Sequence, residues 1–119
     1  MTPSKGGCAF CRIITDRPPW ALFHADEIVS FKPFGAVNKQ HRMFVPVMHV
    51  ATAADSPVWT GKCFEEAARW AAVKAVPFNL VVNSGAEAGQ SVFHLHIHYV
   101  PREADDGLGY LFKREGSNE

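Results

Sequence analysis

Residues 92–101 read Val92-Phe93-His94-Leu95-His96-Ile97-His98-Tyr99-Val100-Pro101. Successive side chains of a β-strand point to opposite faces of its sheet, so alternate residues of this run share a face. A strand over 92–100 would place the three histidines on one face. Its other face would carry Phe93, Leu95, Ile97 and Tyr99. The run therefore predicts a strand with one face buried in a core and the other available for chemistry.

The chain before this run predicts four more strands. Apolar runs with aromatic and β-branched residues occur at 20–24 and 27–32, and the two residues between them predict a β-hairpin. The segment 41–47 is predicted as a short strand with Met43 and Val45 on one face and Phe44 on the other. The segment 78–83 alternates and is also predicted as a strand. Pro101 ends the last strand because it has no N–H for the ladder.

One long helix is predicted between the third and fourth strands. Ser56 followed by Pro57 is typical of a helix start, with Ser as the N-cap and Pro at the first helical position. An apolar stripe at helical spacing follows at Trp59, Cys63, Ala67 and Trp70. The pattern stops before Pro77. Because a sheet must cover its apolar face, we expect an α+β fold, a five-stranded antiparallel sheet with one main helix packed on it.

The composition is that of one globular domain. The chain has 119 residues, of which 47% are apolar and 20% charged, and both the size and these fractions are typical of a single folded unit. We expect one domain over 1–119, with its core at about 8–112. Frayed termini are expected at 1–7 and about 113–119.

The charge balance excludes some classes of partner. Lys and Arg together number 12, as do Asp and Glu, so the global attraction that a non-specific nucleic-acid or membrane-surface binder needs is absent. No apolar run approaches the length of a transmembrane helix, and residues 1–7 contain no apolar signal segment. With only three cysteines, we expect a reducing, cytoplasmic compartment.

Three histidines on one strand face allow three interpretations. They could form an ordinary solvated surface, although Ser, Thr and Lys would serve equally well there. Histidines at i and i+2 could ligate one metal ion with an open position for water, as in a zinc-dependent hydrolase. A neutral imidazole could instead act as a nucleophile while its neighbours hold the anion under attack.

The loop before the histidines favours the nucleophile. Residues 83–91 read Asn-Ser-Gly-Ala-Glu-Ala-Gly-Gln-Ser and offer backbone N–H groups, an amide and a hydroxyl. Such a loop can bind phosphate oxygens in a protein that carries no net positive charge. A zinc hydrolase would need no such phosphate site.

Residues 81–85 and 89–98 together resemble the signature of the histidine-triad (HIT) nucleotide hydrolases and transferases, and most of all its Hint branch. They read Val-Val-Asn-Ser-Gly and Gly-Gln-Ser-Val-Phe-His-Leu-His-Ile-His. Residues 44–49, Phe-Val-Pro-Val-Met-His, resemble the family's apolar-Pro-x-x-His segment, and residues 8–14 its N-terminal element. The resemblance covers roughly 8–102 and implies a HIT-like fold.

The resemblance implies a reaction through a covalent nucleotidyl-histidine. His96 would attack the α-phosphate of a nucleoside phosphoramidate or dinucleoside polyphosphate, and water would then hydrolyse the adduct. His98 and Ser91 would assist by hydrogen-bonding phosphate oxygens or the leaving group. The phosphate contacts implied are Asn83, Gly89, Ser91, His98 and His41.

The same resemblance implies a nucleoside pocket lined by Phe10, Phe31 and Phe34, although core positions would explain these phenylalanines equally well. Where the family usually places Asp or Asn to hold the ribose hydroxyls, this chain has Pro33, which has neither a side-chain acceptor nor an N–H. We therefore expect altered nucleoside selectivity. Candidate substitutes are Lys32, Asn38, Lys39 and Arg42.

Cys8 and Cys11 form a C-x-x-C, which alone fits a metal half-site, a redox pair or two incidental thiols. Some relatives carry zinc on two N-terminal cysteines, the histidine of the Pro-x-x-His segment and the first histidine of the triplet. Here those positions are Cys8, Cys11, His49 and His94. The resemblance thus implies a structural Cys₂His₂ zinc site. Cys63 is expected in the core.

The resemblance also implies a homodimer. An exposed strand edge and a helix bearing two tryptophans agree with that expectation, because a small sheet alone would leave them poorly covered. The expected partner is a nucleotide or nucleotidyl conjugate, with no requirement for nucleic acid or membrane. A non-catalytic nucleotide-binding or adaptor protein is the alternative, because Pro33 weakens a substrate contact.

Overall fold

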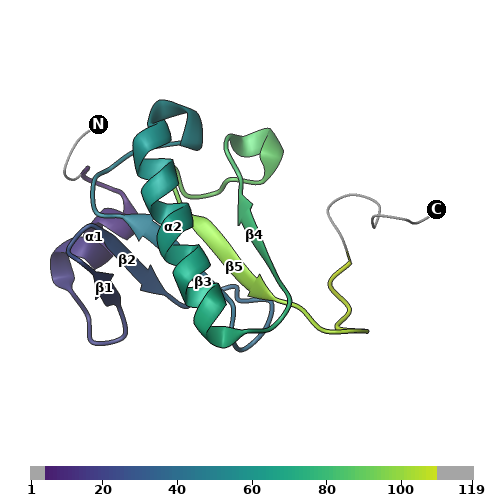
Figure 1. The fold of residues 1–119 in the computed structure, drawn as a ribbon. Helices are drawn as coiled ribbons and strands as arrows, with labels where there is room; N and C mark the ends of the chain where they lie inside the picture. Colours follow the sequence, from purple (N-terminus) through teal and green to yellow (C-terminus); the bar gives the residue numbers. More distant parts are fainter. Residues whose placement is uncertain (1–4, 110–119) are drawn as a thin grey trace.

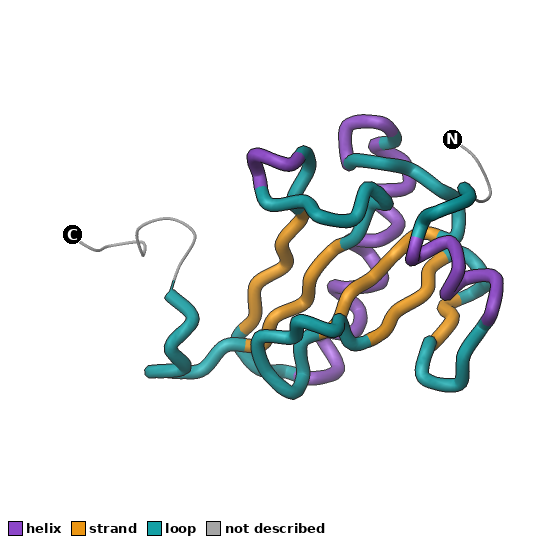
Figure 2. The backbone as a smooth tube through the Cα atoms, turned by 180° about the vertical axis from the view of Figure 1, so that it is seen from behind, coloured by secondary structure: helices purple, strands orange, loops and turns teal. Residues whose placement is uncertain are grey.

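The computed structural model describes residues 5–109 and consists of a five-stranded sheet with a helix on each face (Figures 1 and 2). The elements are α1 (Ala9–Asp16), β1 (Leu22–His24), β2 (Ile28–Phe31), β3 (Arg42–Pro46), η1 (Ala53–Asp55), α2 (Pro57–Lys74), β4 (Phe78–Val82), η2 (Ala86–Ala88) and β5 (Ile97–Pro101). The strand order is β1-β2-β3-β5-β4, and all neighbours are antiparallel. The predicted α+β fold and antiparallel sheet are confirmed.

The long helix α2 covers the face of the sheet that is turned to the viewer in Figure 1. Ser56 caps it by accepting a hydrogen bond from the backbone N of Trp59 at 3.2 Å, as the sequence predicted. The helix buries three small residues, Cys63, Ala67 and Ala71. Small side chains let it lie close to the sheet, and burial raises the pKa of the Cys63 thiol to about 12. Cys63 is therefore a core residue, as expected.

The short helix α1 lies on the opposite face and was missed at the sequence level. Its apolar residues Phe10, Ile13 and Ile14 have helical spacing, but so few of them give a weak signal. Cys8 caps the helix, with its Sγ accepting from the backbone N of Cys11 at 3.3 Å. Arg17 ends it in the left-handed conformation. Packing of Phe10 on the sheet, rather than local propensity, stabilises this helix.

The hairpin of β1 and β2 is confirmed, with Leu22 opposite Ser30 and His24 opposite Ile28. Ala25 and Asp26 both have positive φ, at 52° and 58°. The backbone N of Glu27 donates to the carbonyl of His24 at 3.1 Å across this turn. Positive φ at both central positions matches the turn to the right-handed twist of the strands, at some cost for a non-glycine residue such as Ala25.

The last strand is shorter than predicted, because β5 covers Ile97–Pro101 and residues 92–96 are irregular. Phe93, expected in the core, is 47% exposed, whereas Leu95, Ile97 and Tyr99 pack under α2 as expected. The backbone N of Leu95 donates to the carbonyl of Val50 at 2.6 Å instead of joining a strand ladder. This deviation lets the ring of His94 turn toward the N-terminal cysteines.

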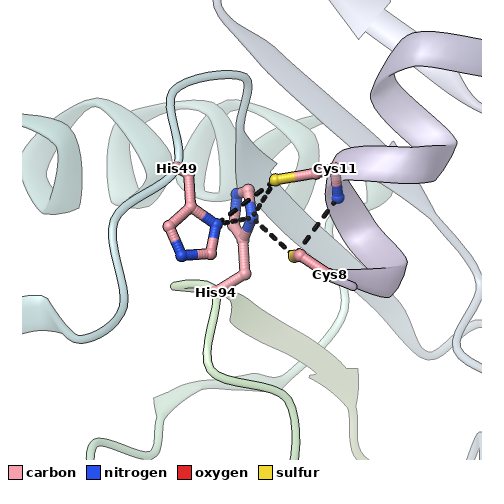
Figure 3. Close-up of side chains that lie close together, drawn as sticks. All are labelled: Cys8, Cys11, His49 and His94. Atoms are coloured by element: carbon pink, nitrogen blue, oxygen red, sulfur yellow. Dashed lines mark hydrogen bonds between the residues drawn. The ribbon is translucent and has the colours of Figure 1, made fainter. Parts of the chain in front are cut away.

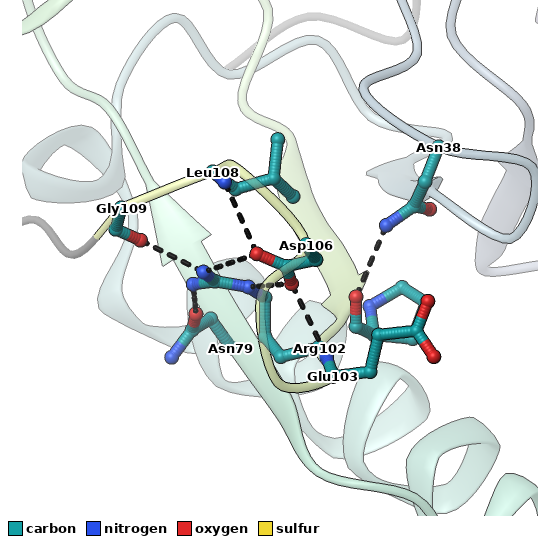
Figure 4. A network of polar contacts seen from close by, with 8 residues as sticks. Asn38, Asn79, Arg102, Glu103, Asp106, Leu108 and Gly109 are labelled. Atoms are coloured by element: carbon teal, nitrogen blue, oxygen red, sulfur yellow. Dashed lines mark hydrogen bonds and ion pairs between the residues drawn. The ribbon is translucent and has the colours of Figure 1, made fainter.

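Arg102 fastens the segment after β5 to β4 (Figure 4). Its guanidinium donates to both carboxylate oxygens of Asp106, at 2.8 and 3.1 Å. It also donates to Oδ1 of Asn79 and to the carbonyl of Gly109, both at 2.8 Å. These bonds hold the pKa of Asp106 well below its usual range. The bond to Asn79 therefore connects the segment after β5 to β4.

Within residues 5–109, neither helix has the length and apolar character needed to cross a membrane. The expected fraying concerns termini that fall mostly outside the described residues, as does the end of the core predicted to reach 112.

Candidate functional site

The face of the sheet opposite α2 is turned to the viewer in Figure 2. The strand register places a row of four side chains on this face, one of them a histidine. Phe31 is paired with Met43, Met43 with His98, and His98 with Val81. Residues directly opposite each other in antiparallel strands point to the same face, so the four form one row. Phe10 of α1 lies against this row, with its ring centre 5.5 Å from that of Phe31.

His96 lies just before β5 and is held by a backbone carbonyl. Its Nδ1 is 2.7 Å from the carbonyl oxygen of His94. Because a carbonyl can only accept, Nδ1 carries the proton and Nε2 keeps its lone pair. The ring of Phe10 stands edge-on to it at 5.2 Å. Burial lowers the pKa of His96, and the bond to His94 opposes that shift. The neutral ring with a free Nε2 is the form a nucleophile requires.

His98 and His41 form a hydrogen-bonded pair whose tautomers follow from a backbone donor. The N–H of Val37 donates to Nδ1 of His41 at 3.0 Å, so that nitrogen is unprotonated. Nε2 of His41 then donates to Nδ1 of His98 at 2.8 Å, which leaves the proton of neutral His98 on Nε2. Burial, followed by the charges of His96 and His41, lowers the pKa of His98 to about 4. His98 therefore offers one N–H donor, and its ring centre lies 5.0 Å from that of His96.

The loop 83–91 directly precedes the segment that carries His94 and His96, and two of its polar side chains are free. Gly89 has φ of 99°, and a Cβ at this position would approach Nδ2 of Asn83 to 3.6 Å. Ser91 is exposed, and among residues 5–109 no hydrogen bond uses its hydroxyl or the amide of Asn83. The backbone N–H of Gly89 is not free, because it donates to the carbonyl of Ala86 at 3.0 Å. The groups that this loop leaves available for an anion are therefore the side chains of Ser91 and Asn83.

Gln90 is a structural residue of the loop that sequence reasoning did not single out. Its buried Oε1 accepts from the backbone N of Gly85 at 2.8 Å. Its Nε2 donates to the carbonyls of Ala51 and Val92, at 2.7 and 3.0 Å. One amide thus ties the loop to the segment after β3. No sequence signal separates this role from that of a ligand-binding amide.

Cys8, Cys11, His49 and His94 converge in one cluster (Figure 3). Sγ of Cys11 is 3.2 Å from Nδ1 of His49 and 3.5 Å from Nδ1 of His94. Sγ of Cys8 is 3.4 Å from Nδ1 of His94, and the two imidazole nitrogens are 3.1 Å apart. All four atoms lie within 4.8 Å of one another. Tetrahedral zinc with these ligands would space them by about 3.3 to 3.8 Å, so the set fits such an ion.

The tautomer of His94 also fits a metal ligand. Its Nε2 lies 2.8 Å from the carbonyl oxygen of Pro46 and must donate to it, so the lone pair of Nδ1 faces the cluster. A metal-bound histidine characteristically donates its other ring N–H to such a carbonyl. Burial lowers the pKa of His94 to about 4 and raises that of the Cys11 thiol.

The three predicted pocket phenylalanines differ in environment. Phe10 and Phe31 are buried in the apolar cluster between α1 and the sheet. Phe34 is fully exposed. It lines a cavity with Phe31 and with Trp20, a residue that the sequence analysis did not select. Pro33 is buried between Lys32 and Phe34, which are both exposed.

Comparisons with known proteins agree with this geometry. A family model described as the HIT domain matches residues 16–105. The chain is 34% identical over 111 residues to adenylylsulfatase HINT3 of Arabidopsis thaliana, and the match covers 87% of this chain but only 56% of that protein. It is 32% identical over 114 residues to the protein hit of Bacillus subtilis, with 89% and 79% of the two chains covered.

Solved structures show the same fold. A protein of Streptococcus mutans superposes with a TM-score of 0.79 at 28% identity, covering 99% of this chain and 80% of that one. A HIT family protein of Bacillus subtilis gives a TM-score of 0.77 at 28% identity, with coverage of 91% and 82%. The arrangement of α1, α2 and the sheet is therefore shared with solved proteins.

Proposed function

Because this chain belongs to the HIT family, we propose that it is a nucleotide hydrolase or nucleotidyl transferase that forms a covalent nucleotidyl-histidine at His96. Its substrates would be nucleoside phosphoramidates, dinucleoside polyphosphates or related nucleotidyl conjugates. The observation that carries the proposal is the 2.7 Å contact of Nδ1 of His96 with the His94 carbonyl. This contact leaves Nε2 as the free nucleophilic nitrogen.

In the first step, Nε2 of His96 attacks the α-phosphorus and forms a P–N bond. The bond from phosphorus to the leaving group breaks, and the leaving group departs with its electron pair. When it is an amine, it takes up a proton from solvent water. The ring of His96 becomes positively charged, because Nδ1 keeps its proton. The carbonyl of His94 accepts a hydrogen bond from that N–H and stabilises the charge.

In the second step, water attacks the phosphorus and the P–N bond to His96 breaks. The water loses a proton, the nucleoside monophosphate leaves, and His96 returns to its neutral form. An alcohol or amine in place of water would give transfer instead of hydrolysis.

Four groups would hold the phosphate oxygens during both steps. The Nε2–H of His98 is a donor whose direction the His41 pair fixes. Ser91 has a free hydroxyl and Asn83 a free amide, in a loop that Gln90 holds in place. The backbone N–H of Gly89 donates to the carbonyl of Ala86 at 3.0 Å and would have to exchange that bond for one to the phosphate. Neutral donors of this kind stabilise an anion without a basic surface, in agreement with the net charge of zero.

The arrangement of the histidines argues against a hydrolase that uses all three as metal ligands. His94 turns into the cysteine cluster, while His98 pairs with His41. The metal-ligand set found within residues 5–109 includes His94 but neither His96 nor His98. A zinc ion bound by the Cys₂His₂ set would instead act as a structural clamp between α1 and the segment 92–96.

A cytoplasmic homodimer belongs to the same proposal. The outer edge of β4 has no strand partner among residues 5–109, and Phe78 and Val76 beside it are 41% and 44% exposed. An uncovered strand edge with apolar neighbours favours pairing with a second copy. Light scattering after gel filtration would measure the mass in solution.

Turnover of a substrate panel tests the proposal. The panel contains adenosine and guanosine phosphoramidates, a dinucleoside polyphosphate and, because one relative is named an adenylylsulfatase, adenylyl sulfate. We expect the parent protein to hydrolyse at least one of them and His96→Ala to lose about 10³-fold or more of that rate, as loss of a nucleophile does. Mass spectrometry of rapidly quenched reactions should detect the nucleotidyl adduct on the parent protein alone.

His24→Gln is the matched control, because His24 lies under α2 on the opposite side of the sheet. It should keep the parental rate. Equal rates for His96→Ala and the parent would refute the nucleophile. Binding of nucleotides without turnover of any substrate would favour the non-catalytic nucleotide-binding alternative.

A further inference from the structure

Cys8 and Cys11 are two thiols at the start of α1 that the proposed reaction at His96 does not use. Cys8 is the N-cap of the helix, and Cys11 follows in its first turn. The backbone N of Cys11 donates to Sγ of Cys8 at 3.3 Å, so the Cys8 side chain lies over this turn. Both sulfurs belong to the group of ligand atoms that lie within 4.8 Å of one another. Two neighbouring cysteines in a C-x-x-C at a helix start are also the arrangement of reactive redox pairs.

The pair is within reach of small molecules. A cavity of about 890 Å³ lies along α1, and both cysteines line it. Cys8 is half-buried, whereas Cys11 is 4% exposed. The third cysteine, Cys63, is buried under α2 and lines neither this cavity nor the metal-ligand cluster. A small oxidant that enters the cavity therefore meets Cys8 first, with Cys11 directly behind it.

The pair is connected to the segment that carries the candidate nucleophile. Sγ of Cys8 and Sγ of Cys11 lie 3.4 and 3.5 Å from Nδ1 of His94. The carbonyl of His94 accepts the hydrogen bond from Nδ1 of His96. Only a thiolate sulfur serves as a metal ligand, so a disulfide would leave the two histidines as the only ligands of the set. Oxidation of the pair would thus remove the metal site and one restraint on His94.

We propose that Cys8 and Cys11 form a reversible oxidation site at which a hydroperoxide converts the two thiols to a disulfide, releases the bound zinc and thereby lowers the activity at His96. The effect on activity rests on the proposed function. The disulfide and the release of zinc do not depend on it.

The chemistry needs a hydroperoxide as the oxidant, here hydrogen peroxide. The thiolate of Cys8 attacks one oxygen, the O–O bond breaks, and the other oxygen leaves as hydroxide and takes up a proton to form water. Cys8 is then a sulfenic acid. The thiolate of Cys11 attacks the sulfur of Cys8, the S–O bond breaks, and a second hydroxide takes up a proton. The two sulfurs give up two electrons, which reduce the peroxide to water, and a dithiol reverses the change by exchange.

Treatment of the zinc-loaded protein with hydrogen peroxide tests the proposal without a substrate. A chromogenic chelator measures the released zinc, and mass spectrometry of peptides measures the disulfide. We expect one zinc ion to be released for each disulfide between Cys8 and Cys11, and Tm to fall to that of the metal-free protein. Dithiothreitol with added zinc should restore both thiols and the parental Tm.

Cys8→Asp makes the test specific. Aspartate can cap a helix and can ligate zinc, but it forms no disulfide, so this variant should keep its zinc under the same treatment. Cys63→Ala is the matched control, because Cys63 lies outside the cavity and the cluster. It should release zinc as the parent does.

Three results would overturn the oxidation site. The first is a parent protein that keeps both thiols and its zinc while free glutathione in the same sample is oxidised. The second is conversion of Cys8 or Cys11 to a sulfinic acid without any disulfide. The third is a reduced parent protein that binds no zinc.

Kinetics separates this inference from the proposed function. The reduced and oxidised forms are compared on a substrate that the reduced form hydrolyses. We expect kcat of the oxidised form to be about tenfold lower, because a small misplacement of a reacting group can cost up to about 10²-fold. Equal kcat for the two forms would overturn the effect on His96 and leave the proposed function intact. Reversible release of zinc without turnover of any substrate would refute the proposed function and support the oxidation site.

Discussion

His94 and His96 are two residues apart, yet their rings hold opposite tautomers. His94 donates from Nε2 to the carbonyl of Pro46 and turns the lone pair of Nδ1 to the cysteine cluster. His96 donates from Nδ1 to the carbonyl of His94 and keeps the lone pair of Nε2 for a substrate. One residue type thus becomes a candidate metal ligand or a candidate nucleophile according to which carbonyl its ring meets.

Removing a metal ligand should have the largest effect on stability and should separate the roles of the two histidines. We expect Cys11→Ser to lose bound zinc and to lower Tm by about 10 °C or more, because a structural zinc ion contributes directly to folding. Plasma mass spectrometry measures the zinc content and scanning calorimetry measures Tm. His96→Ala should retain all of its zinc.

Cys63→Ala is the matched control for this prediction, since Cys63 is a buried cysteine under α2, outside the cluster. It should bind zinc as the parent does. A parent protein purified without zinc and unable to bind it, or a Cys11→Ser variant with a full zinc content, would contradict the metal centre.

The second largest effect is expected on acidification, which should lower the free energy of unfolding through protonation of His98 in its pair with His41. The pKa of His98 is about 4 in the fold and about 6.5 in the unfolded chain, so the unfolded chain binds more protons between these values. The free energy of unfolding should therefore fall as pH decreases through that window, by up to about 1.4 kcal/mol per pH unit for this group. Urea denaturation at several pH values measures it.

His98→Gln should show a flatter pH dependence over the same window. The difference between the two proteins isolates His98, because the metal centre contributes equally to both. Parallel pH profiles for His98→Gln and the parent would mean that His98 is not held neutral by the fold.

Loss of the Gln90 amide should have the smallest effect on stability. It should nevertheless change both the site around His96 and the metal cluster that contains His94. Gln90→Met would leave the N–H of Gly85 and the carbonyl of Ala51 without their partner. We expect a loss of about 1–2 kcal/mol in the free energy of unfolding, a higher KM and weaker zinc binding. Denaturation, kinetics and a competitive zinc chelator measure the three. An effect on KM alone would show that the loop and the metal centre are uncoupled.

Local patterns were sufficient to predict much of the fold. The hairpin of β1 and β2 and the helix α2 follow from apolar periodicity and from signals such as Ser56 before Pro57, which act over a few residues. The α1 helix was missed because its stability comes from the contact of Phe10 with residues of β2 and β3. Such a contact between distant segments cannot be read from a local pattern, and the few apolar residues of α1 give only a weak periodic signal.

The members of the Cys₂His₂ cluster were predictable, but their geometry was not. Cys8 and His94 are 86 residues apart, and the resemblance to the HIT family placed them together before the structure did so. The prediction of one regular strand over 92–100 was wrong at His94. Its ring points toward the cysteine cluster, and the strand begins only at Ile97. The tautomers depend on carbonyls that only the folded chain brings to each ring.

Leu95 stands between the two histidines and packs under α2. Three consecutive side chains therefore enter three different environments, namely the cysteine cluster, the helix core and the candidate reaction site. An inserted or deleted residue at this point would rotate the following side chains to the wrong face of the sheet. Residues of segment 94–96 can therefore be tested by substitution, whereas an insertion or deletion there would displace all three environments at once.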